Sequence, residues 1–278
     1  MSTRPRKRFA QHWLRSEKAL NKIVSAAQLQ PHDRILEIGP GTGILTRRLL
    51  AEAAVVVAVE IDRDLCAKLA KNLGVRENFL LLQGDILAMN LETQIQPFPL
   101  FCHPNKVVAN IPYNITGPII EKLLGTIAVP ATQPYESIVL LVQREVAHRL
   151  CSKPGSKNFG ALSVRVQYLA KSEFICDVPA KAFYPPPKVD SAVVRLSPQP
   201  PEIAASNPKH LSTVIKLGFA NKRKMLRNNL TSIIDAANLT TVLEKLEINP
   251  QSRAEDLSVA DWVRLSDALE LLQNSAHK

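Results

Sequence analysis

The sequence predicts an α/β fold, with a doubly wound sheet in a first domain and a small all-α domain after it. Over residues 1–197, short apolar and β-branched runs alternate with helical patterns, which is typical of a parallel sheet flanked by helices. The run "AVVVAVEI" is almost entirely apolar, as a strand buried on both faces should be. Beyond the turn-rich linker "SPQPPEIAASNP" only helical patterns follow. We therefore expect two domains, residues 1–197, with a basic arm at 1–15, and residues 198–278.

The elements of the first domain follow from these runs and from the residues that interrupt them. Strands are expected at residues 34–39, 54–61, 79–85, 106–111 and 137–143. Helices are expected at residues 43–52, 64–73 and 144–150. Past a loop rich in Gly, Ser and Pro, two final strands are predicted, "LSVRVQYLA" (162–170) and "VDSAVVRL" (189–196).

The second domain contains helical patterns and no strand pattern. They cover residues 210–220, 222–230, 240–247 and 259–272. A helical domain of this size buries little apolar surface by itself, so we expect it to be marginal alone and to dock on the first domain.

Charge and composition narrow the classes of function. The chain has 35 Lys and Arg against 25 Asp and Glu, and the formal net charge of +10 favours a polyanionic partner, nucleic acid or an anionic membrane surface. No apolar run is long enough for a transmembrane helix, and no apolar segment follows the basic N-terminus as in a secretory signal. A cytoplasmic protein is expected, with a short organelle-targeting arm left open. The widely spaced Cys66, Cys102, Cys151 and Cys176 indicate buried thiols in a reducing compartment and no metal site.

The strongest local motif is "LEIGPGTG", at the end of the first predicted strand. Gly39, Gly41 and Gly43 allow a tight turn and a close approach of the backbone to a ligand, with a helix N-terminus behind it. The spacing G-x-G-x-G, with Glu37 ahead of it, differs from the G-x-G-x-x-G of dinucleotide-binding loops. It suits a ligand with a carboxylate and an amine, and it resembles motif I of S-adenosylmethionine-dependent methyltransferases. A purely structural turn is the alternative.

Two further acids end neighbouring predicted strands. Glu60 is placed to accept hydrogen bonds from both ribose hydroxyls of such a cofactor, and Asp85 from the exocyclic amine of its adenine. An acid at a strand end can also be a helix N-cap, a role for which Asp62 and Asp64 are better placed than Glu60. Both Glu60 and Asp85 fall at the carboxyl edge of the predicted sheet, where folds of this type bind ligands.

The stretch "VVANIPYN" (107–114) ends a strand in an amide, a proline and an aromatic ring. The exocyclic nitrogen of adenine is a poor nucleophile because its lone pair is delocalised into the ring. The Asn110 side-chain oxygen and a backbone carbonyl of Ile111–Pro112 can hold the amine hydrogens and aim the lone pair at a methyl sulfonium. Pro112 stiffens the turn, and Tyr113 can stack on a flipped base. Alignment carries the rate, so no titrating base is needed.

Asn-Ile-Pro-Tyr resembles the signatures of adenine-amine methyltransferases, and over about residues 6–270 the chain resembles the small-subunit ribosomal RNA adenine dimethyltransferases. That family dimethylates two adjacent adenosines near the 3′ end of the RNA. The resemblance implies a Rossmann-like class I methyltransferase domain, S-adenosylmethionine as cofactor, and a monomer acting on the RNA within a pre-assembled 30S-type particle. It is carried by "KRFAQHWL", "VQREVAHRL", "PGSKNFGALSV", "FYPPPKVDSAVVRL" and "NKRKMLRNNL".

The same resemblance implies roles for three more residues. His12 and Leu14 would contact the cofactor, and Phe183 would sandwich the target base against Tyr113. Packing of a Pro-rich turn is the alternative for Phe183. Trp13 stands where the family usually has Phe, a mild departure.

Basic residues cluster at two places, and the overall charge favours contact with RNA phosphates over a merely solvated face. Helical spacing would put Arg223 and Arg227 on one face, with Lys224 beside them, and these three are our predicted RNA-binding residues. The full clusters are Arg4, Arg6, Lys7, Arg8 and Arg15, and Lys222, Arg223, Lys224 and Arg227.

Two rival functions stay open. A large-subunit ribosomal RNA adenine methyltransferase of the macrolide-resistance type shares every cofactor motif, although the basic helical run and the "PGSKNFG" loop favour the small-subunit enzyme. A non-catalytic ribosome-assembly or transcription factor could keep the fold, but the intact Asn-Ile-Pro-Tyr speaks against it. A nicotinamide dehydrogenase is poorly supported because the glycine spacing is wrong.

Overall fold

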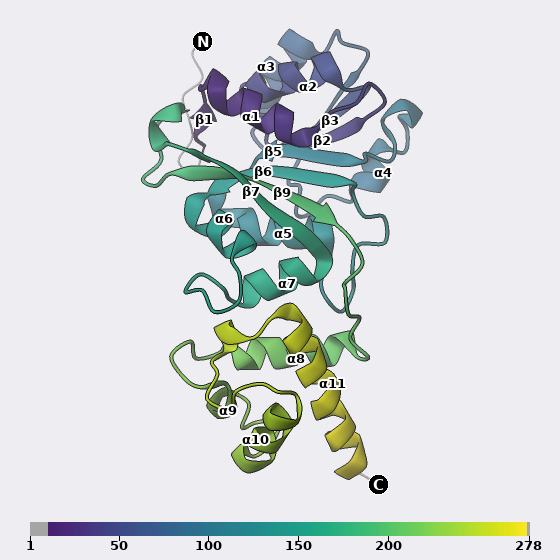
Figure 1. The fold of residues 1–278 in the computed structure, drawn as a ribbon. Helices are drawn as coiled ribbons and strands as arrows, with labels where there is room; N and C mark the ends of the chain where they lie inside the picture. The colour runs from purple at the N-terminus through teal and green to yellow at the C-terminus, as the bar shows by residue number, and fades with distance from the viewer. Residues whose placement is uncertain (1–10, 277–278) are drawn as a thin grey trace. The chain divides into compact units, whose positions relative to one another are not determined.

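A seven-stranded sheet is the centre of the computed structural model, which describes residues 11–276 (Figure 1). Strands β2 to β6 pair in parallel, and β9 runs antiparallel to β6. The strand order β4-β3-β2-β5-β6-β9-β7 reverses between β2 and β5, the place where such sheets bind ligands. The strands are β2 (Arg34–Ile38), β3 (Val55–Glu60), β4 (Phe79–Gln83), β5 (Lys106–Asn110), β6 (Ser137–Gln143), β7 (Ala170–Val178) and β9 (Ser191–Pro198).

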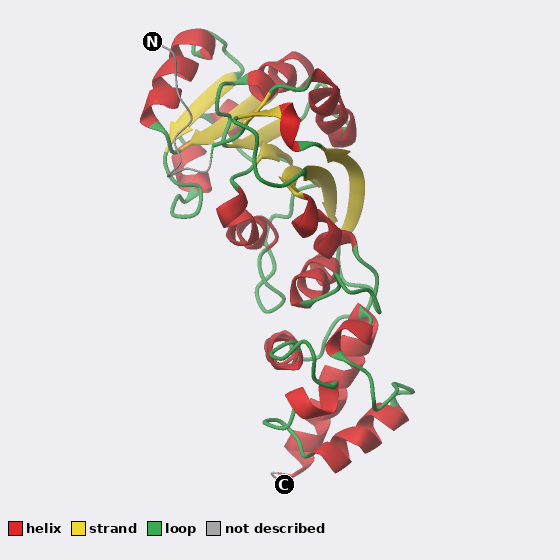
Figure 2. Cartoon of the chain, turned by 90° about the vertical axis from the view of Figure 1, so that its left-hand side faces the viewer, coloured by secondary structure: helices red, strands yellow, loops and turns green. Residues whose placement is uncertain are grey.

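Helices cover both faces of this sheet (Figures 1 and 2). On one face lie α1 (Glu17–Ala27), α2 (Ile44–Glu52) and α3 (Arg63–Leu73), and on the other lies α5 (Thr116–Leu124). Leu20 and Ile23 of α1 are fully buried in the core against the sheet. The sequence analysis did not predict α1, although Ser16 caps it by accepting a hydrogen bond from the Ala19 N–H, 3.3 Å away. The short α4 (Leu91–Ile95) follows β4, and α6 (Arg144–Cys151) follows β6.

The α/β fold and its five parallel strands are confirmed, with ends that differ from the predicted ones by at most two residues. All six residues of β3 are buried, in agreement with the five consecutive apolar residues that precede Glu60. The predicted helices 43–52, 64–73 and 144–150 correspond to α2, α3 and α6.

The predicted strand at residues 162–170 is wrong, because this segment forms α7 (Ala161–Leu169). Its apolar residues recur at every second position, which suggested a strand. In the structure Ser163 and Gln167, one helical turn apart, donate hydrogen bonds to carbonyl groups in and just after the last turn of α6. The strand comes later, as the half-buried β7, whose residues show no clean alternation. Polar contacts with α6 therefore favour the helix, and the pattern of apolar residues does not reveal such contacts.

The second helical region is confirmed as all-helical, although the helix predicted at residues 240–247 begins earlier, at Ala236, and the one predicted at residues 222–230 is shorter. Residues 222–225 form a turn, in which the Lys224 N–H donates to the Asn221 carbonyl, and α9 (Leu226–Asn229) starts only afterwards. Arg223 and Arg227 therefore do not share a helix face as predicted. The other helices are α8 (Pro208–Gly218), α10 (Ala236–Lys245) and α11 (Val259–Ala276).

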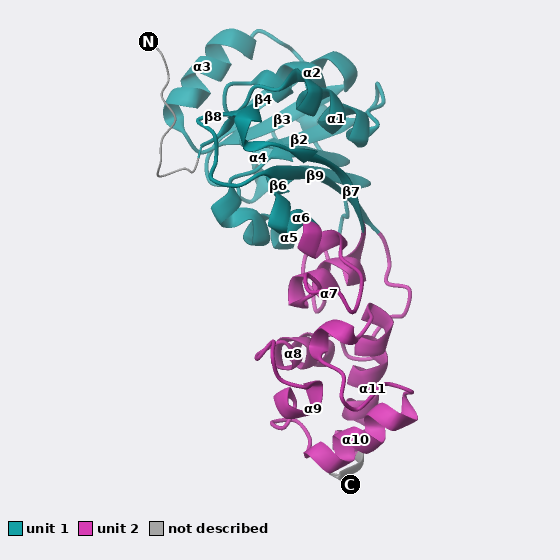
Figure 3. Cartoon of the chain, turned by 60° about the vertical axis from the view of Figure 1, so that its left-hand side comes forward, with its two compact units in different colours: residues 1–123, 132–147, 172–198 teal, residues 124–131, 148–171, 199–278 magenta. Residues whose placement is uncertain are grey.

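The chain divides into two compact units, drawn in different colours in Figure 3. One unit contains the described residues up to Leu123, residues 132–147 and residues 172–198. The other contains residues 124–131, residues 148–171 and the chain from Gln199 onward. The second unit therefore includes α7 and the loop before it. That the chain forms two independently folding domains divided between residues 197 and 198 stays a prediction.

Among the helices that the structure describes, none has the length and apolar character needed to cross a membrane.

Candidate active site

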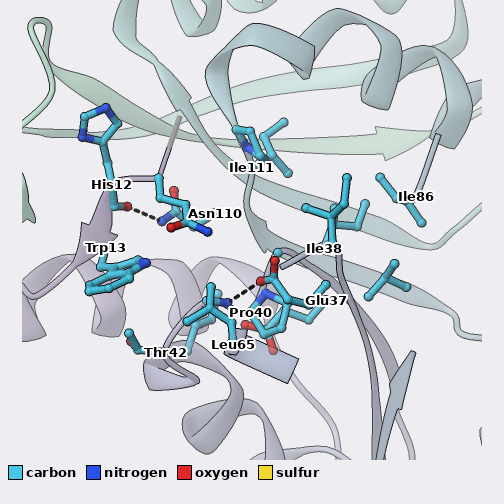
Figure 4. Close-up of a pocket in the computed structure, with 18 of the residues that line it drawn as sticks. His12, Trp13, Glu37, Ile38, Pro40, Thr42, Leu65, Ile86, Asn110 and Ile111 are labelled. Atoms are coloured by element: carbon cyan, nitrogen blue, oxygen red, sulfur yellow. Dashed lines mark hydrogen bonds between the residues drawn. The ribbon is translucent and has the colours of Figure 1, made fainter. Parts of the chain in front are cut away.

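A pocket lies at the carboxyl edge of the parallel strands, where β2, β3, β4 and β5 end (Figure 4). Its wall is completed by the N-terminal segment that carries β1 (Trp13–Leu14). The wall includes every residue predicted to bind the cofactor, together with the predicted catalytic loop: His12, Leu14, Gly39, Gly41, Glu60, Asp85, Asn110, Ile111, Pro112 and Tyr113.

The turn between β2 and α2 requires glycine. Gly39 and Gly41 have φ angles of +69° and +59°, in the left-handed region that other residues avoid. A Cβ atom on Gly41 would lie 3.5 Å from Cδ1 of Trp13, and one on Gly39 would lie 3.7 Å from the Asn110 carbonyl oxygen. Behind the turn, the N-cap of α2 makes no side-chain hydrogen bond, so no side chain there satisfies the first backbone N–H groups of the helix.

Glu60 is fixed at the end of β3 by two backbone groups. Its Oε2 accepts from the Gly41 N–H at 3.1 Å and its Oε1 accepts from the Asp62 N–H at 2.9 Å. The residue is 5% exposed, and this burial raises the pKa of its carboxyl group, against the lowering effect of the two hydrogen bonds. Both oxygens keep lone pairs for hydroxyl donors in the pocket.

Asp85 and Asp62 have different surroundings. Asp85 is exposed in the turn after β4, where one of its oxygens accepts from the Leu87 N–H at 2.9 Å. Asp62 is the N-cap of α3, as predicted, and its second oxygen accepts from the Gln11 side chain at 3.0 Å. Asp62 therefore ties the N-terminal segment to the pocket.

Glu37 is a buried acid in the wall of the pocket. It is 1% exposed, and its Oε2 has no hydrogen-bond partner among the described residues. Burial raises the pKa of Glu37 to about 8; the nearby Thr46 hydroxyl lowers it and the negative charge of Glu60 raises it further. Glu37 is therefore mainly protonated at neutral pH.

Glu37→Gln should reduce the pH dependence of stability. Between the ordinary pKa of 4.5 and the folded-state pKa of about 8, the folded protein holds a proton that the unfolded chain has lost. The free energy of unfolding should therefore fall as the pH rises through this window, by up to about 1.4 kcal/mol per pH unit from this group. Urea unfolding at about pH 5.5 and about pH 7.5 should show a smaller loss in the variant than in the wild type. The exposed Glu52→Gln is the control, and equal losses in all three proteins would contradict the raised pKa.

Asn110 ends β5 with its side chain oriented by the N-terminal segment (Figure 4). Its Nδ2 donates to the His12 carbonyl at 3.3 Å, which leaves Oδ1 as the free acceptor of the amide. The His12 ring stacks on Tyr113, with ring centroids 6.0 Å apart, and its Nδ1–H donates to the Pro185 carbonyl at 2.8 Å. The Tyr113 hydroxyl hydrogen-bonds to the Ser191 hydroxyl.

Phe183 is the one predicted catalytic residue outside the pocket wall. It lies in β8 (Phe183–Tyr184), which pairs antiparallel with β1, and its side chain is 4% exposed within the core. Stacking on a base would require the ring to leave that core, so the role of Phe183 stays a prediction. Arg4, Arg6, Lys7 and Arg8 lie outside the described residues. Arg223, Lys224 and Arg227 belong to the other compact unit.

The sequence analysis gave no site role to Gln11 or Trp13, although both line the pocket. The Trp13 Nε1–H is buried and has no partner among the described residues. The signal was present in the sequence, because Gln11 and Trp13 are the chain neighbours of His12, which was predicted to contact the cofactor. Within the described chain, no three His, Cys, Asp or Glu side chains are grouped as metal ligands.

The donor and acceptor groups of this pocket fit S-adenosylmethionine. Glu60 and Asp85 supply acceptors for ribose hydroxyls and an adenine amine. The Trp13 Nε1–H is a donor in need of an acceptor, which the cofactor's carboxylate would provide. Apolar walls, from Ile38, Ile61, Ile86 and Ile111, suit the adenine ring.

A doubly wound sheet with a glycine turn, two acids and Asn-Ile-Pro-Tyr at its carboxyl edge defines an S-adenosylmethionine-dependent methyltransferase. The family model for ribosomal RNA adenine dimethylase matches residues 2–271. The chain belongs to that family.

Relatives and solved structures agree with this assignment. A protein of Nostoc sp. named ribosomal RNA small subunit methyltransferase A is 67% identical, and the match covers 96% of this chain and 98% of that protein. The protein of the same name from Synechocystis sp. is 57% identical over 97% and 98%. A dimethyladenosine transferase from Plasmodium falciparum has a TM-score of 0.76 at 27% identity, covering 95% of this chain and 98% of its own. The 23S rRNA methyltransferase ErmE has a TM-score of 0.72 at 26% identity, covering 93% and 99%.

Proposed function

We propose that the protein transfers methyl groups from S-adenosylmethionine to the N6 atoms of two adjacent adenosines near the 3′ end of small-subunit ribosomal RNA. Its substrate is the RNA within a pre-assembled 30S-type particle, and it acts as a cytoplasmic monomer. The observation that carries the activity is Asn110, with a free acceptor oxygen at the edge of a pocket suited to the cofactor. The choice of the small subunit is supported by relatives at 57–67% identity that carry this name.

The strand order supports a position for each part of the cofactor. Along the edge, Asp85 follows β4, Glu60 ends β3, the glycine turn follows β2, and Asn110 ends β5. Asp85 is placed to accept from the adenine amine and Glu60 from the ribose hydroxyls. The turn with Gly41 then receives the amino-acid part, so the transferable methyl group comes nearest to Asn110.

Asn110 orients the target amine. Its Oδ1 accepts one N–H of the adenine amine, and a carbonyl of the Ile111–Pro112 segment accepts the other. Two acceptors placed in this way favour a pyramidal nitrogen whose lone pair is directed at the methyl group, so the geometry lowers the barrier without a general base. Tyr113 supplies the stacking surface for the base. After the first transfer the methylated nitrogen would lose one proton to solvent, and its one remaining N–H would be held by one of the two acceptors during the second transfer.

Glu60→Ala should weaken cofactor binding and leave RNA binding unchanged. The ribose hydroxyls lose a charged acceptor, worth about 1.5–3 kcal/mol, or a rise in Kd of roughly 10- to 100-fold. Isothermal calorimetry with S-adenosylmethionine measures the change. Glu60→Gln keeps one acceptor for the Gly41 or Asp62 N–H, so its cofactor affinity should fall less. The exposed Glu52→Ala should bind the cofactor as the wild type does. Unchanged affinity in Glu60→Ala would remove Glu60 from the site.

RNA contact by the second unit is supported by a basic surface, which in the structure includes more residues than the three predicted from the sequence. The Lys222 Nζ donates to the Lys157 carbonyl at 2.8 Å, which joins the turn at 222–225 to the "PGSKNFG" loop. Lys153, Lys157 and Arg223 are exposed there, as are Lys222 and Lys224. Phosphate contacts of this kind position RNA without reading its sequence, so these residues should set binding and not chemistry.

Changing Arg223, Lys224 and Arg227 together to Ala should weaken binding to the small-subunit particle. The slope of log K against log salt should fall by about 0.7–0.9 for each lost contact. Filter binding over a salt series measures it. Cofactor affinity should stay unchanged, and the methylation rate should recover at saturating particle concentration. A salt slope equal to that of the wild type would show that this surface is only solvated.

The proposed activity is tested by incubating the protein with radiolabelled S-adenosylmethionine and, in parallel reactions, immature small subunits or large-subunit RNA, followed by mass spectrometry of the nucleosides. N6,N6-dimethyladenosine at two adjacent positions is the expected product. Label in large-subunit RNA only would favour the rival enzyme, which the fold similarity to ErmE keeps open. No transfer to either RNA would favour a non-catalytic assembly factor.

A further inference from the structure

The ribbon formed by β1 and β8 has two different faces. Leu14 pairs with Phe183, and Trp13 pairs with Tyr184. Directly opposed residues of an antiparallel pair project to the same side. Leu14 and Phe183 are 3% and 4% exposed and belong to the core, so their face is the inner one. Trp13 and Tyr184 therefore share the outer face, where Tyr184 is 47% exposed.

A cation completes this outer face. Arg15 lies two residues after Trp13, and its guanidinium carbon is 4.1 Å from the centre of the Tyr184 ring. Arg15 is exposed, and no carboxylate of the described residues forms an ion pair with it. The neighbouring acids are already paired, Glu17 with Arg48 and Asp190 with Arg144. The exposed Lys181 and Lys188 of the same segment add positive charge. An exposed ring beside an unpaired guanidinium suits a base and its phosphate.

The outer face of the ribbon borders the methyl-acceptor side of the pocket. Pro185, the residue after Tyr184, accepts the hydrogen bond from His12 Nδ1 at 2.8 Å. The His12 ring stacks on Tyr113, and the His12 carbonyl accepts from Asn110. Trp13, which shares the outer face with Tyr184, itself lines the pocket. A nucleotide on this face is therefore next to the base that Asn110 and Tyr113 receive.

We infer that Tyr184 and Arg15 bind a nucleotide adjacent to the target adenosine, with its base stacked on the Tyr184 ring and its phosphate paired with Arg15. The inference rests on the proposed RNA substrate and adds a second base-stacking site beside the one proposed for Tyr113. Stacking is tolerant of sequence because every base has a π-face. This stacking site therefore fixes the position of the RNA strand and does not select a particular base. Tyr184 and Arg15 are positioning residues in this assignment.

The test compares Tyr184→Ala, Tyr184→Phe and Arg15→Ala on immature small-subunit particles, by filter binding and by methylation kinetics. Tyr184→Ala should raise Kd and KM for the particle about 5- to 100-fold, with kcat at saturation and S-adenosylmethionine affinity unchanged. Tyr184→Phe keeps the ring and should restore binding. Arg15→Ala should lower the salt slope by about 0.7, the value for one lost phosphate contact. Phe98→Ala, which removes an aromatic side chain 43% exposed elsewhere in the same unit, should change nothing.

Three results would overturn the inference. The first is an unchanged affinity of Tyr184→Ala for the particle. The second is a Tyr184→Phe variant that binds the particle as weakly as Tyr184→Ala does. The third is a loss of cofactor affinity, or a fall in melting temperature, large enough to account for the loss of RNA binding. Failure of the proposed function has a different signature, because it appears as absence of methyl transfer by the wild type. In that case the comparison of particle binding between Tyr184→Ala and Tyr184→Phe still decides the role of the ring. A wild type that does not bind the particle overturns both.

Discussion

Asn110→Ala should lower the rate of methyl transfer about 10²–10³-fold while S-adenosylmethionine affinity stays within a few-fold, by analogy with removing one preorganised polar group from an active site. The adenine amine loses the acceptor that holds one of its hydrogens, so the nitrogen lone pair returns to the ring. Single-turnover kinetics with saturating cofactor and particle isolate this step. A variant that still dimethylates at nearly the wild-type rate would show that the alignment role is wrong.

The same substitution also removes the hydrogen bond from Asn110 Nδ2 to the His12 carbonyl, and two controls separate the effects. Asn110→Asp keeps an acceptor and loses the donor, so its rate should lie between those of the wild type and the alanine variant. Asn114→Ala removes an exposed amide in the same loop and should leave the rate unchanged. If the aspartate variant is as slow as the alanine variant, orientation of the N-terminal segment by His12 outweighs the acceptor.

Trp262→Ala should destabilise the helical unit by about 3–5 kcal/mol, the usual cost of truncating a large buried aromatic residue. The Trp262 side chain is 0% exposed, and its ring centroid is 5.3 Å from that of Phe219. The packing is tight around it, since a Cβ atom on Gly218 would lie 2.3 Å from the indole. Leu272→Ala, on the exposed side of α11, is the matched control and should cost little.

The response to this variant also tests the domain boundary predicted between residues 197 and 198. If the helical region folds as a separate domain, calorimetry of Trp262→Ala should show one transition moved to lower temperature and a second at the wild-type position. S-adenosylmethionine should then shift only the second transition, because its pocket lies in the first unit. A single transition that moves as a whole would show that the chain unfolds cooperatively and that no such boundary exists.

The buried strands and the pocket residues could be predicted for one physical reason. A strand covered on both faces by helices is apolar over most of its length, so the apolar stretches of β2, β3 and β5 stand out along the chain. Parallel strands end at one edge, so Glu60 and Asn110, each the last residue of its strand, had to meet there. Gly39 and Gly41 were readable because a positive φ leaves almost no other choice.

Two segments without a two-face burial pattern were mispredicted. In α7, apolar residues at alternate positions suggested a strand, but Ser163 and Gln167 bond to carbonyls that only the folded chain brings near. In the segment 222–225, the run of basic residues suggested a helix, yet a turn closed by the Asn221 carbonyl precedes α9. In both places the conformation depends on a hydrogen bond to a backbone carbonyl, and the pattern of apolar residues gives no information about that bond.

The sequence by itself determined the class of fold, the glycine turn, the acids that end two of the strands and the Asn-Ile-Pro-Tyr loop, because each follows from residues close together in the chain. Only the tertiary structure decided which of two neighbouring aromatic residues faces outward. Phe183 and Tyr184 lie in a two-residue strand, too short to show any alternation, and the pairing with Trp13 and Leu14 sets their sides. That pairing joins segments about 170 residues apart, so Phe183 enters the core and Tyr184 becomes the exposed residue only once the chain has folded.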